Sequence, residues 1–292
     1  MISPIAVWIS ERDDARVGTL YPHRKRGSES ATFTYHPDYV ARPGAYGVDP
    51  VLPLSNAPHH TAQGHALFGA FTDSAPDRWG RTLILRAESR SAREESRTAR
   101  ALSELDFLVG VRDDLRQGAL RFADAAGNFL ASDATGVPAL TDLPSLLALA
   151  DHAERDTASL PDLQRLVHAG GSLGGARPKA HATLPGGALA IAKFPSIERD
   201  TWDVMAWERV LTSLAADAGI AVPPSQLVRL TDRSVFVTER FDQRVTTRGT
   251  ERVGQRPGKV GSRVGAVAQG VRGSDRYSQM CAVAASIDRY ES

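Results

Sequence analysis

The sequence predicts an α+β protein in which short strands alternate with helices in two successive segments. In residues 1–122, runs rich in β-branched and aromatic residues at 5–9 and 31–35 are typical of strands. In residues 172–242, a glycine-rich loop is followed by two strands, a helix and two further strands. The length of 292 residues is also what about two domains require.

The composition is that of a folded globular chain. Hydrophobic residues make up 42% and charged residues 24% of the sequence, which argues against a disordered, collagen-like or disulfide-rich protein. The single cysteine, Cys281, excludes an intrachain disulfide and fits a reducing compartment. No apolar run approaches the roughly 20 residues that span a bilayer, and the N-terminus lacks the basic start of a signal peptide. We therefore expect a cytoplasmic protein without a membrane partner.

Residues 1–122 are predicted to form one mixed unit. The motif SAPD at 74–77 is typical of a helix start, with Ser74 as the cap and a proline in the first turn, and this helix is expected to end near Arg90. Residues 118–122 are predicted to be a closing strand. Residues 123–171 are predicted to be a helical connector, because two groups of apolar residues recur at helical spacing: Leu143, Leu146, Leu147 and Ala150, then Leu163, Leu166 and Val167.

Residues 172–242 are predicted to form a second, β-rich unit. Strands are expected at 180–184 and 188–194, joined by a Pro-Gly-Gly turn, and at 226–230 and 234–240. Between these pairs, a helix at 203–218 has apolar residues spaced by three and four positions, which predicts an amphipathic helix. These residues are Val204, Trp207, Val210, Leu211, Leu214 and Ala218.

The glycine-rich motif GGSLGGARPK at 170–179 precedes the first of these strands. Its glycines allow positive φ and the close approach of a ligand, and successive N–H groups in such a loop can bind an anion. Arg177 and Lys179 add positive charge, so the loop is a candidate cradle for the phosphates of a nucleotide. It matches neither the Walker A motif nor G-x-G-x-x-G. A turn that only connects a helix to a strand is the alternative.

Lys193 is a charged residue in an otherwise apolar predicted strand. Its stem can lie along apolar surface while the ammonium reaches a phosphate. Glu208 lies on the following predicted helix, and a strand lysine held by a helix glutamate is the arrangement with which kinases place the α- and β-phosphates. An edge-strand lysine and a solvated glutamate are the alternatives.

The segment VFVTERFD at 235–242 begins with the alternation of a strand and ends with polar residues. In a nucleotide-binding lobe it would be the hinge, whose backbone meets the edge of the adenine. A buried strand with a charged end is the alternative.

Several of these motifs resemble, in the same order, those of the HipA family of serine/threonine kinases, which are toxins of bacterial toxin–antitoxin pairs. They are GSLGGARPK at 171–179, AKFP at 192–195, AGIAVP at 218–223 and TERFD at 238–242, with DSAPDRWGR at 73–81 and QGALRF at 117–122 upstream. The resemblance covers residues 1–244. It implies a HipA-like N-terminal subdomain at 1–122 and a kinase-like, β-rich N-lobe at 172–242.

The resemblance also implies a role for each matching residue. ATP phosphates would be contacted by Gly174, Gly175, Ala176, Arg177, Pro178 and Lys179. Lys193 would be the phosphate-binding lysine, and Glu208 would match the acidic residue of the next helix. Adenine would be contacted by Glu239, Arg240 and Phe241, with Asp242 near the ribose. Ser172 would be the loop serine that the family autophosphorylates, a modification that ejects the loop and turns the kinase off.

As cofactors and partners, the resemblance implies ATP, Mg²⁺, a HipB-like helix-turn-helix antitoxin through which DNA is bound, and a protein substrate such as an aminoacyl-tRNA synthetase. The family's catalytic loop, however, is not found. It carries an aspartate base and a Mg²⁺-binding asparagine in an Asp-x-His-x-x-Asn type run, with a further metal-binding aspartate after it. The chain has no histidine after His181 and no asparagine after Asn128. We therefore expect the C-lobe to be missing and the chain to be inactive alone, and we assign no catalytic or metal residue.

The composition changes after Asp242. Residues 243–292 hold 9 basic and 4 acidic residues, against 26 and 30 in the first 242 residues. Arginine, glycine and valine dominate 244–273, a composition that buries little apolar surface and predicts a poorly ordered tail. Our hypothesis is a truncated or frame-shifted gene, in which 243–292 is translated out of frame. An intact downstream frame that encodes the missing loop would support it, and its absence would make the tail a genuine extension.

Two other functions stay open. The chain could be a non-catalytic regulator that binds the antitoxin, which capture of a neighbouring helix-turn-helix protein would reveal. The basic tail could bind nucleic acid, which predicts binding that depends steeply on salt and is lost when residues 244–292 are deleted.

Overall fold

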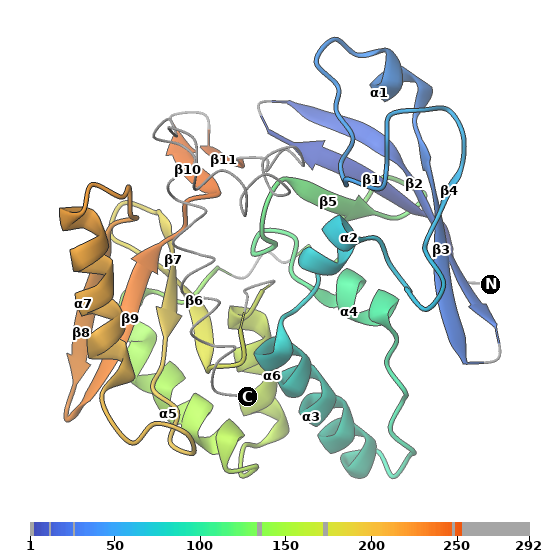
Figure 1. Ribbon diagram of the computed structural model, residues 1–292. Helices are drawn as coiled ribbons and strands as arrows, with labels where there is room; N and C mark the ends of the chain where they lie inside the picture. The colour runs from blue at the N-terminus through green and yellow to red at the C-terminus, as the bar shows by residue number, and fades with distance from the viewer. Residues whose placement is uncertain are drawn as a thin grey trace. The chain divides into compact units, whose positions relative to one another are not determined.

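The computed structural model describes residues 3–11, 13–25, 27–132, 136–171, 175–246 and 249–252, and all statements on structure refer to these residues. They form two compact units (Figure 1). The first unit contains the described residues of Met1–Pro76, Ala101–Thr135 and Asp242–Gly261, and the second those of Asp77–Arg100 and Gly136–Phe241. Both units combine helices with antiparallel sheet, which confirms the predicted α+β class. No described helix is long and apolar enough to cross a membrane.

The first unit is built on a five-stranded antiparallel sheet with the order β4-β3-β2-β1-β5. Its strands are β1 (Ile5–Ser10), β2 (Asp14–Lys25), β3 (Ser28–Tyr35), β4 (His59–His60) and β5 (Leu120–Ala123), and its helices are α1 (Pro37–Ala41), α2 (Gly69–Asp73) and α4 (Glu104–Gly110). Strands β1, β3 and β5 confirm the predictions for 5–9, 31–35 and 118–122. In the core, the ring of Phe71 packs edge to face on Phe33 and Phe122, with centroid distances of 5.5 and 5.8 Å.

The sequence pattern does not predict β2, because Gly18 and Pro22 interrupt it. Both residues have positions that a strand tolerates. A Cβ on residue 18 would lie 2.3 Å from the carbonyl oxygen of Thr34, so only glycine fits there. Pro22 lies beyond Leu20, where the pairing of β2 with β1 ends, and it is paired on its other side with Ala31. Its missing N–H therefore costs no hydrogen bond to β1.

The second unit holds a four-stranded antiparallel sheet with the order β6-β7-β9-β8. The strands β6 (Lys179–Thr183), β7 (Leu189–Lys193), β8 (Ser225–Leu230) and β9 (Arg233–Glu239) confirm the four predicted strands. One face of the sheet consists of small and β-branched residues: Ala180, Ala182, Ala190, Ala192, Val235 and Val237. This face shares one hydrophobic core with the leucines of α5 (Leu143–Glu154) and α6 (Leu160–Ala169). The predicted connector helices are therefore part of the core of the second unit.

Helix α3 (Arg78–Glu94) begins three residues later than the sequence predicts. Its cap is Asp77, whose Oδ1 accepts a hydrogen bond of 2.7 Å from the N–H of Gly80. Ser74 instead follows the end of α2, where its hydroxyl donates to the carbonyl of Ala70. This bond explains the difference, because the hydroxyl is already used when the chain reaches α3. The helix also extends past Arg90, and it belongs to the second of the two compact units.

The first residues after Asp242 are ordered, contrary to the prediction for 243–292. Strands β10 (Gln243–Thr246) and β11 (Gly249–Arg252) form a two-stranded antiparallel sheet. Within the first unit, the amide of Gln243 donates to the carbonyl of Asp114 at 3.1 Å, and the guanidinium of Arg252 donates to the carbonyl of Asp113. Residues 253–292 lie outside the described part of the chain, so the prediction for them stays a prediction.

Arg116 is the largest fully buried side chain of the first unit. Its guanidinium donates to the carbonyl oxygens of Ser74, Leu108 and Val111 at 2.8, 3.0 and 2.9 Å. It also lies 4.7 Å from the ring centroid of Phe122. Burial lowers the pKa of Arg116 to about 9, because the charged form loses its water. The carbonyls replace that water and tie α2, α4 and the following loop together.

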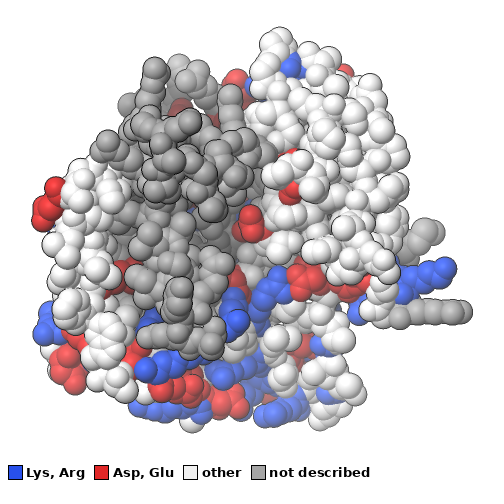
Figure 2. Space-filling view, viewed as in Figure 1, with Lys and Arg blue, Asp and Glu red and all other residues white. Residues whose placement is uncertain are grey.

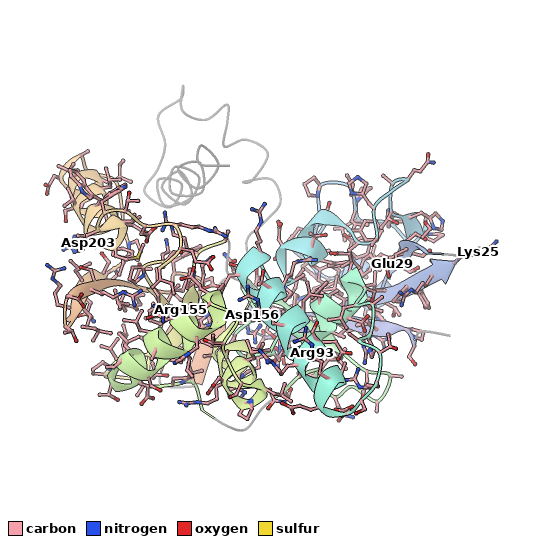
Figure 3. All side chains as sticks on the ribbon, turned by 90° about the horizontal axis from the view of Figure 1, so that it is seen from below. Lys25, Glu29, Arg93, Arg155, Asp156 and Asp203 are labelled. Carbon is pink, nitrogen blue, oxygen red and sulfur yellow. The ribbon has the colours of Figure 1, made fainter. Side chains whose placement is uncertain are left out.

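We expect Arg116→Met to lower the free energy of unfolding of the first unit by about 3 kcal/mol, because buried carbonyls lose their donor. Urea unfolding with hydrogen exchange of the β1–β3 amides measures this loss. Arg93→Met is the matched control, because Arg93 lies exposed on α3 (Figure 3). An equal loss in both variants would contradict the role of Arg116.

Candidate functional site

The strand register gathers positive charge on one face of the second sheet. In the antiparallel pairing, Lys179 of β6 is opposite Lys193 of β7, which is opposite Phe236 of β9. Residues directly opposite each other point to the same side of a sheet, so these three side chains share a face. The alanine-rich core occupies the other face. The candidate site is therefore the face that carries Lys179 and Lys193.

Lys193 and Glu208 form the ion pair that the sequence predicts. Helix α7 (Val204–Asp217) places Glu208 so that its Oε1 accepts a hydrogen bond from Nζ of Lys193. The two side chains are 26% and 23% exposed, so the pair is partly open to solvent. The ammonium also lies 5.8 Å from the ring centroid of Phe236, within cation–π range. The lysine is thus held in place and still accessible to a ligand.

Lys179 forms a second ion pair that is almost completely buried. Its Nζ lies 2.7 Å from Oδ2 of Asp77, and the two side chains are 4% and 7% exposed. Asp77 therefore has two functions, since its other oxygen caps α3. A buried ion pair of this kind stabilises the fold only if both charged groups keep their partners. Lys179 thus links the candidate site to the start of α3. A phosphate that contacts Lys179, as predicted, would have to lie beside the carboxylate of Asp77.

Arg177 faces a third carboxylate. Its guanidinium donates to Oδ1 of Asp200, and Oδ2 of Asp200 accepts a hydrogen bond of 2.9 Å from the N–H of Ser196. These contacts connect the residues before β6 with the loop between β7 and α7. The sequence gives no signal for this partner, because 23 residues separate the two side chains.

Only the second half of the glycine-rich loop lies in the described part of the chain. Gly175 has a φ of +105°, which confirms that the loop uses the conformational freedom of glycine. After it, Ala176 and Pro178 lead into β6, and the carbonyl of Pro178 accepts a hydrogen bond of 2.9 Å from the N–H of Phe194. Ser172 and Gly174 lie outside the described residues, so their predicted roles are not tested.

The predicted hinge uses part of its backbone within the sheet. The N–H of Glu239 donates to the carbonyl of Pro224, and the N–H of Arg240 donates to the carbonyl of Leu189, both over short distances of 2.9 and 2.8 Å. Phe241 follows with a partly exposed ring. Asp242, by contrast, belongs to the first unit, where its Oδ2 accepts a hydrogen bond of 2.7 Å from the N–H of Gly118. Contact of these residues with a nucleotide stays a prediction.

A hydrogen-bonded chain that the sequence does not predict links the hinge to the end of α6. His181 of β6 is fully buried, with Nδ1 3.2 Å from the carbonyl oxygen of Ala169 and Nε2 3.0 Å from Nη1 of Arg240. Arginine can only donate, so Nε2 accepts and Nδ1 donates its proton to Ala169. A neutral imidazole therefore joins the residue before the glycine-rich loop to the hinge. In the sequence, only the position of His181 between two alanines indicates that this histidine is buried.

The described residues offer no obvious metal centre. Among them, no group of three or more His, Cys, Asp or Glu side chains lies close enough together to hold a metal ion. One polar atom of the site face does lack a partner. Oγ1 of Thr238, which is paired with Ile191 in the sheet, is buried without a hydrogen bond.

Two family models match the chain in order. The HipA N-terminal domain matches residues 5–120, and the HipA-like C-terminal domain matches residues 171–289. The chain belongs to the HipA family. The second match continues to residue 289, so it extends the family likeness past residue 244, where the resemblance of the sequence motifs ends. A comparison with curated proteins finds no match.

Among solved structures, the chain is similar to a HipA toxin–antitoxin complex from Shewanella oneidensis MR-1, which contains HipA, HipB and its operator DNA. The sequence identity is 15%, and the TM-score is 0.49. The alignment covers 85% of this chain and 53% of that chain, so the protein spans about half the length of this solved relative.

We expect Asp77→Asn to lower the free energy of unfolding of the second unit by about 2–3 kcal/mol, because asparagine still caps α3 but leaves the buried ammonium of Lys179 without this carboxylate. Thermal and urea unfolding of the full chain measure it.

The double variant Asp77→Asn/Lys179→Met supplies the control for this pair. Because it removes both charges, it should lose less stability than the sum of the single variants. Additive losses would show that the two side chains do not interact.

Proposed function

We propose that the protein is the nucleotide-binding part of a HipA-type serine/threonine kinase and that it binds ATP on the lysine face of the second sheet. Lys193 binds phosphate oxygens, and Glu208 holds the ammonium group of Lys193 in position. The ion pair between these two residues is the observation that carries the proposal, because kinases use the same strand-lysine and helix-glutamate arrangement. Family membership supports it independently.

The exposure of the two ion pairs favours phosphate binding at Lys193 over binding at Lys179. Lys179 shares a buried position with Asp77, whereas the pair of Lys193 is about a quarter exposed. A triphosphate could therefore reach Lys193 without entering the core. Gly175 and Arg177 would lie along the phosphates, and Thr238 would offer its unpaired hydroxyl on the same face. The hinge at Glu239–Phe241 would meet the adenine.

We further propose that this chain does not transfer phosphate by itself. A kinase needs an aspartate base and side chains that hold Mg²⁺. The sequence has no Asp-x-His-x-x-Asn run, since it lacks histidine after His181 and asparagine after Asn128. We assign no residue of the chain to Mg²⁺.

For the partners, we propose a HipB-like helix-turn-helix antitoxin, with DNA bound only through it, and a cellular protein such as an aminoacyl-tRNA synthetase as the family's substrate. This proposal places the protein in the cytoplasm. Its support is membership of the HipA family.

A non-catalytic role is the second candidate, and the missing catalytic loop favours it. In this case the N-terminal domain at 5–120 holds the antitoxin, and the protein acts as a decoy or regulator. Capture of the helix-turn-helix protein by Lys193→Met as well as by the unchanged chain would support this role. Capture that requires ATP and Lys193 would oppose it.

We expect ATP binding, measured by calorimetry or with a fluorescent ATP analogue, to weaken about tenfold in Lys193→Met, which corresponds to about 1.4 kcal/mol. Glu208→Gln should weaken it less, because the lysine remains but loses its charged partner. Lys25→Met is the control, since Lys25 is exposed on β2 of the first unit (Figure 3). Equal affinities in Lys193→Met and the unchanged chain would refute the assignment of the site.

We expect no transfer of label from radioactive ATP to the purified chain. Strong labelling that disappears in Ser172→Ala would overturn the proposal that the chain is inactive alone. Labelling of Ser172 that appears only after addition of a separate polypeptide with the catalytic loop would support a split kinase.

A further inference from the structure

Helix α7 turns its hydrophobic side away from the sheet. Its buried residues are Met205 and Thr212, and the apolar residues on its opposite side are strongly exposed. These are Trp207 at 55%, Val210 at 44%, Leu211 at 47% and Leu214 at 57%. An amphipathic helix normally buries its apolar side, so the orientation of α7 is the reverse of what its sequence pattern predicts.

Polar contacts on the inner side explain this orientation. Glu208 faces the sheet because it holds Lys193, and the cap residue Asp203 accepts a hydrogen bond from the hydroxyl of Ser234 on β9. Together these contacts fix the rotation of the helix about its axis. The apolar residues at 207, 210, 211 and 214 then align on the outer side, since positions three and four residues apart lie on one face of a helix.

Trp202 extends the apolar side beyond the helix. It is 53% exposed, and its ring packs edge to face on Trp207 with a centroid distance of 6.2 Å. We call Trp202, Trp207, Val210, Leu211 and Leu214 the α7 stripe. Figure 2 shows that the surface at the left over α7 is mostly white, that is, without charged side chains. A contiguous exposed apolar patch of this kind marks an interaction site.

We infer that the α7 stripe binds the same stripe of a second copy of the protein, with the two helices antiparallel about a two-fold axis. In such a pair the axis passes between Val210 and Leu211, so Val210 of each copy contacts Leu211 of the other. Trp207 of each copy then lies against Leu214 of the other. A two-fold axis lets one surface bind itself, so both stripes are covered without a further partner.

The sizes of the side chains favour the antiparallel orientation. Both tryptophans of the stripe lie at its N-terminal end, whereas the chain at the C-terminal end of α7 carries the small exposed residues Ala218 and Gly219. In an antiparallel pair, Trp202 of one copy lies over these small residues of the other. A parallel pair would place tryptophan against tryptophan and leave a gap between the small residues, which close packing does not tolerate.

The charges at the two ends of α7 are also complementary. Arg229 is 62% exposed and lies at the N-terminal end, where its guanidinium is 3.0 Å from Oδ2 of Asp203. Asp217 is the last residue of the helix and is exposed. An antiparallel pair brings Arg229 of each copy near Asp217 of the other, and it also opposes the two helix dipoles. The stripe between these ends contains no charge that binding would have to desolvate.

The exposed area of the stripe is sufficient for a specific but weak dimer. A tryptophan side chain can bury up to about 250 Å², and the two tryptophans are each about half exposed. With the leucines and the valine, each stripe offers roughly 500 Å² and the pair about 1,000 Å², which is the lower limit for a specific interface. We therefore expect a dissociation constant in the micromolar range.

Analytical ultracentrifugation of the full chain over a hundredfold range of concentration measures self-association. The average mass should rise from that of one chain to that of two. Val210→Asp/Leu214→Asp should raise the dissociation constant at least tenfold, because each new charge would be buried without a partner. Leu85→Asp is the matched control, since Leu85 is an apolar residue of α3 that is 46% exposed.

Two results would overturn the inference. One is a chain that stays monomeric at every concentration, which would leave the α7 stripe to a different protein. The other is a dimer that the aspartates at 210 and 214 weaken no more than Leu85→Asp does. Circular dichroism checks that each variant is folded.

Cysteine cross-linking tests the antiparallel arrangement in a Cys281→Ser background. Leu211→Cys lies beside the proposed axis, so mild oxidation should link two copies, whereas the exposed control Tyr21→Cys on β2 should not be linked. A mixture of Trp207→Cys and Leu214→Cys should form the mixed dimer in preference to the two symmetric dimers. A mixed dimer that is no more frequent than random pairing predicts would overturn this arrangement.

Discussion

The alternation of side chains along β6, β7 and β9 is the constraint on which the second unit depends. Successive residues of a strand face opposite sides, so the alanines at 180, 182, 190 and 192 fall on the core face, and Lys179, His181 and Lys193 fall on the other. Because alanine is small, α5 and α6 can approach the sheet closely. A shift of the register by one residue would turn the lysines toward α5 and α6 and the alanines toward the opposite face. The same strand register therefore determines both the core and the candidate site.

Each cation of the site faces a carboxylate from a different element. Lys179 is paired with Asp77 at the start of α3, Lys193 with Glu208 of α7, and Arg177 with Asp200. These pairs differ mainly in burial, and a buried charge is costly to separate from its partner. The open pair can change its contacts when a ligand arrives, whereas the closed pair cannot. Burial thus separates Lys193, whose ion pair is partly open to solvent, from Lys179, whose ion pair is closed.

The ion pair between Lys193 and Glu208 also accounts for the exposed side of α7. Since Glu208 must face the sheet to hold Lys193, the opposite side of the helix faces outward, and in this sequence that side is apolar. The ion pair of the candidate site and the outward apolar side of α7 are therefore linked. The match to the HipA-like C-terminal domain covers residues 171–289, so it continues past Asp242. The hairpin β10–β11, which packs on Asp113 and Asp114, is the described part of that continuation.

The sequence by itself determined the α+β class, most strands and helices, the family and the Lys193–Glu208 pair, because alternation, helical spacing and local motifs are properties of neighbouring residues. Tertiary structure alone decided the rest. Asp77 rather than Ser74 caps α3, because the hydroxyl of Ser74 is taken by α2. His181 gains its role from partners 12 and 59 residues away in the sequence. The partner of Asp200 lies 23 residues away, and the most distant partner of Arg116 lies 42 residues away. Periodicity shows that α7 has an apolar side, but only its contacts with the sheet decide that this side faces outward.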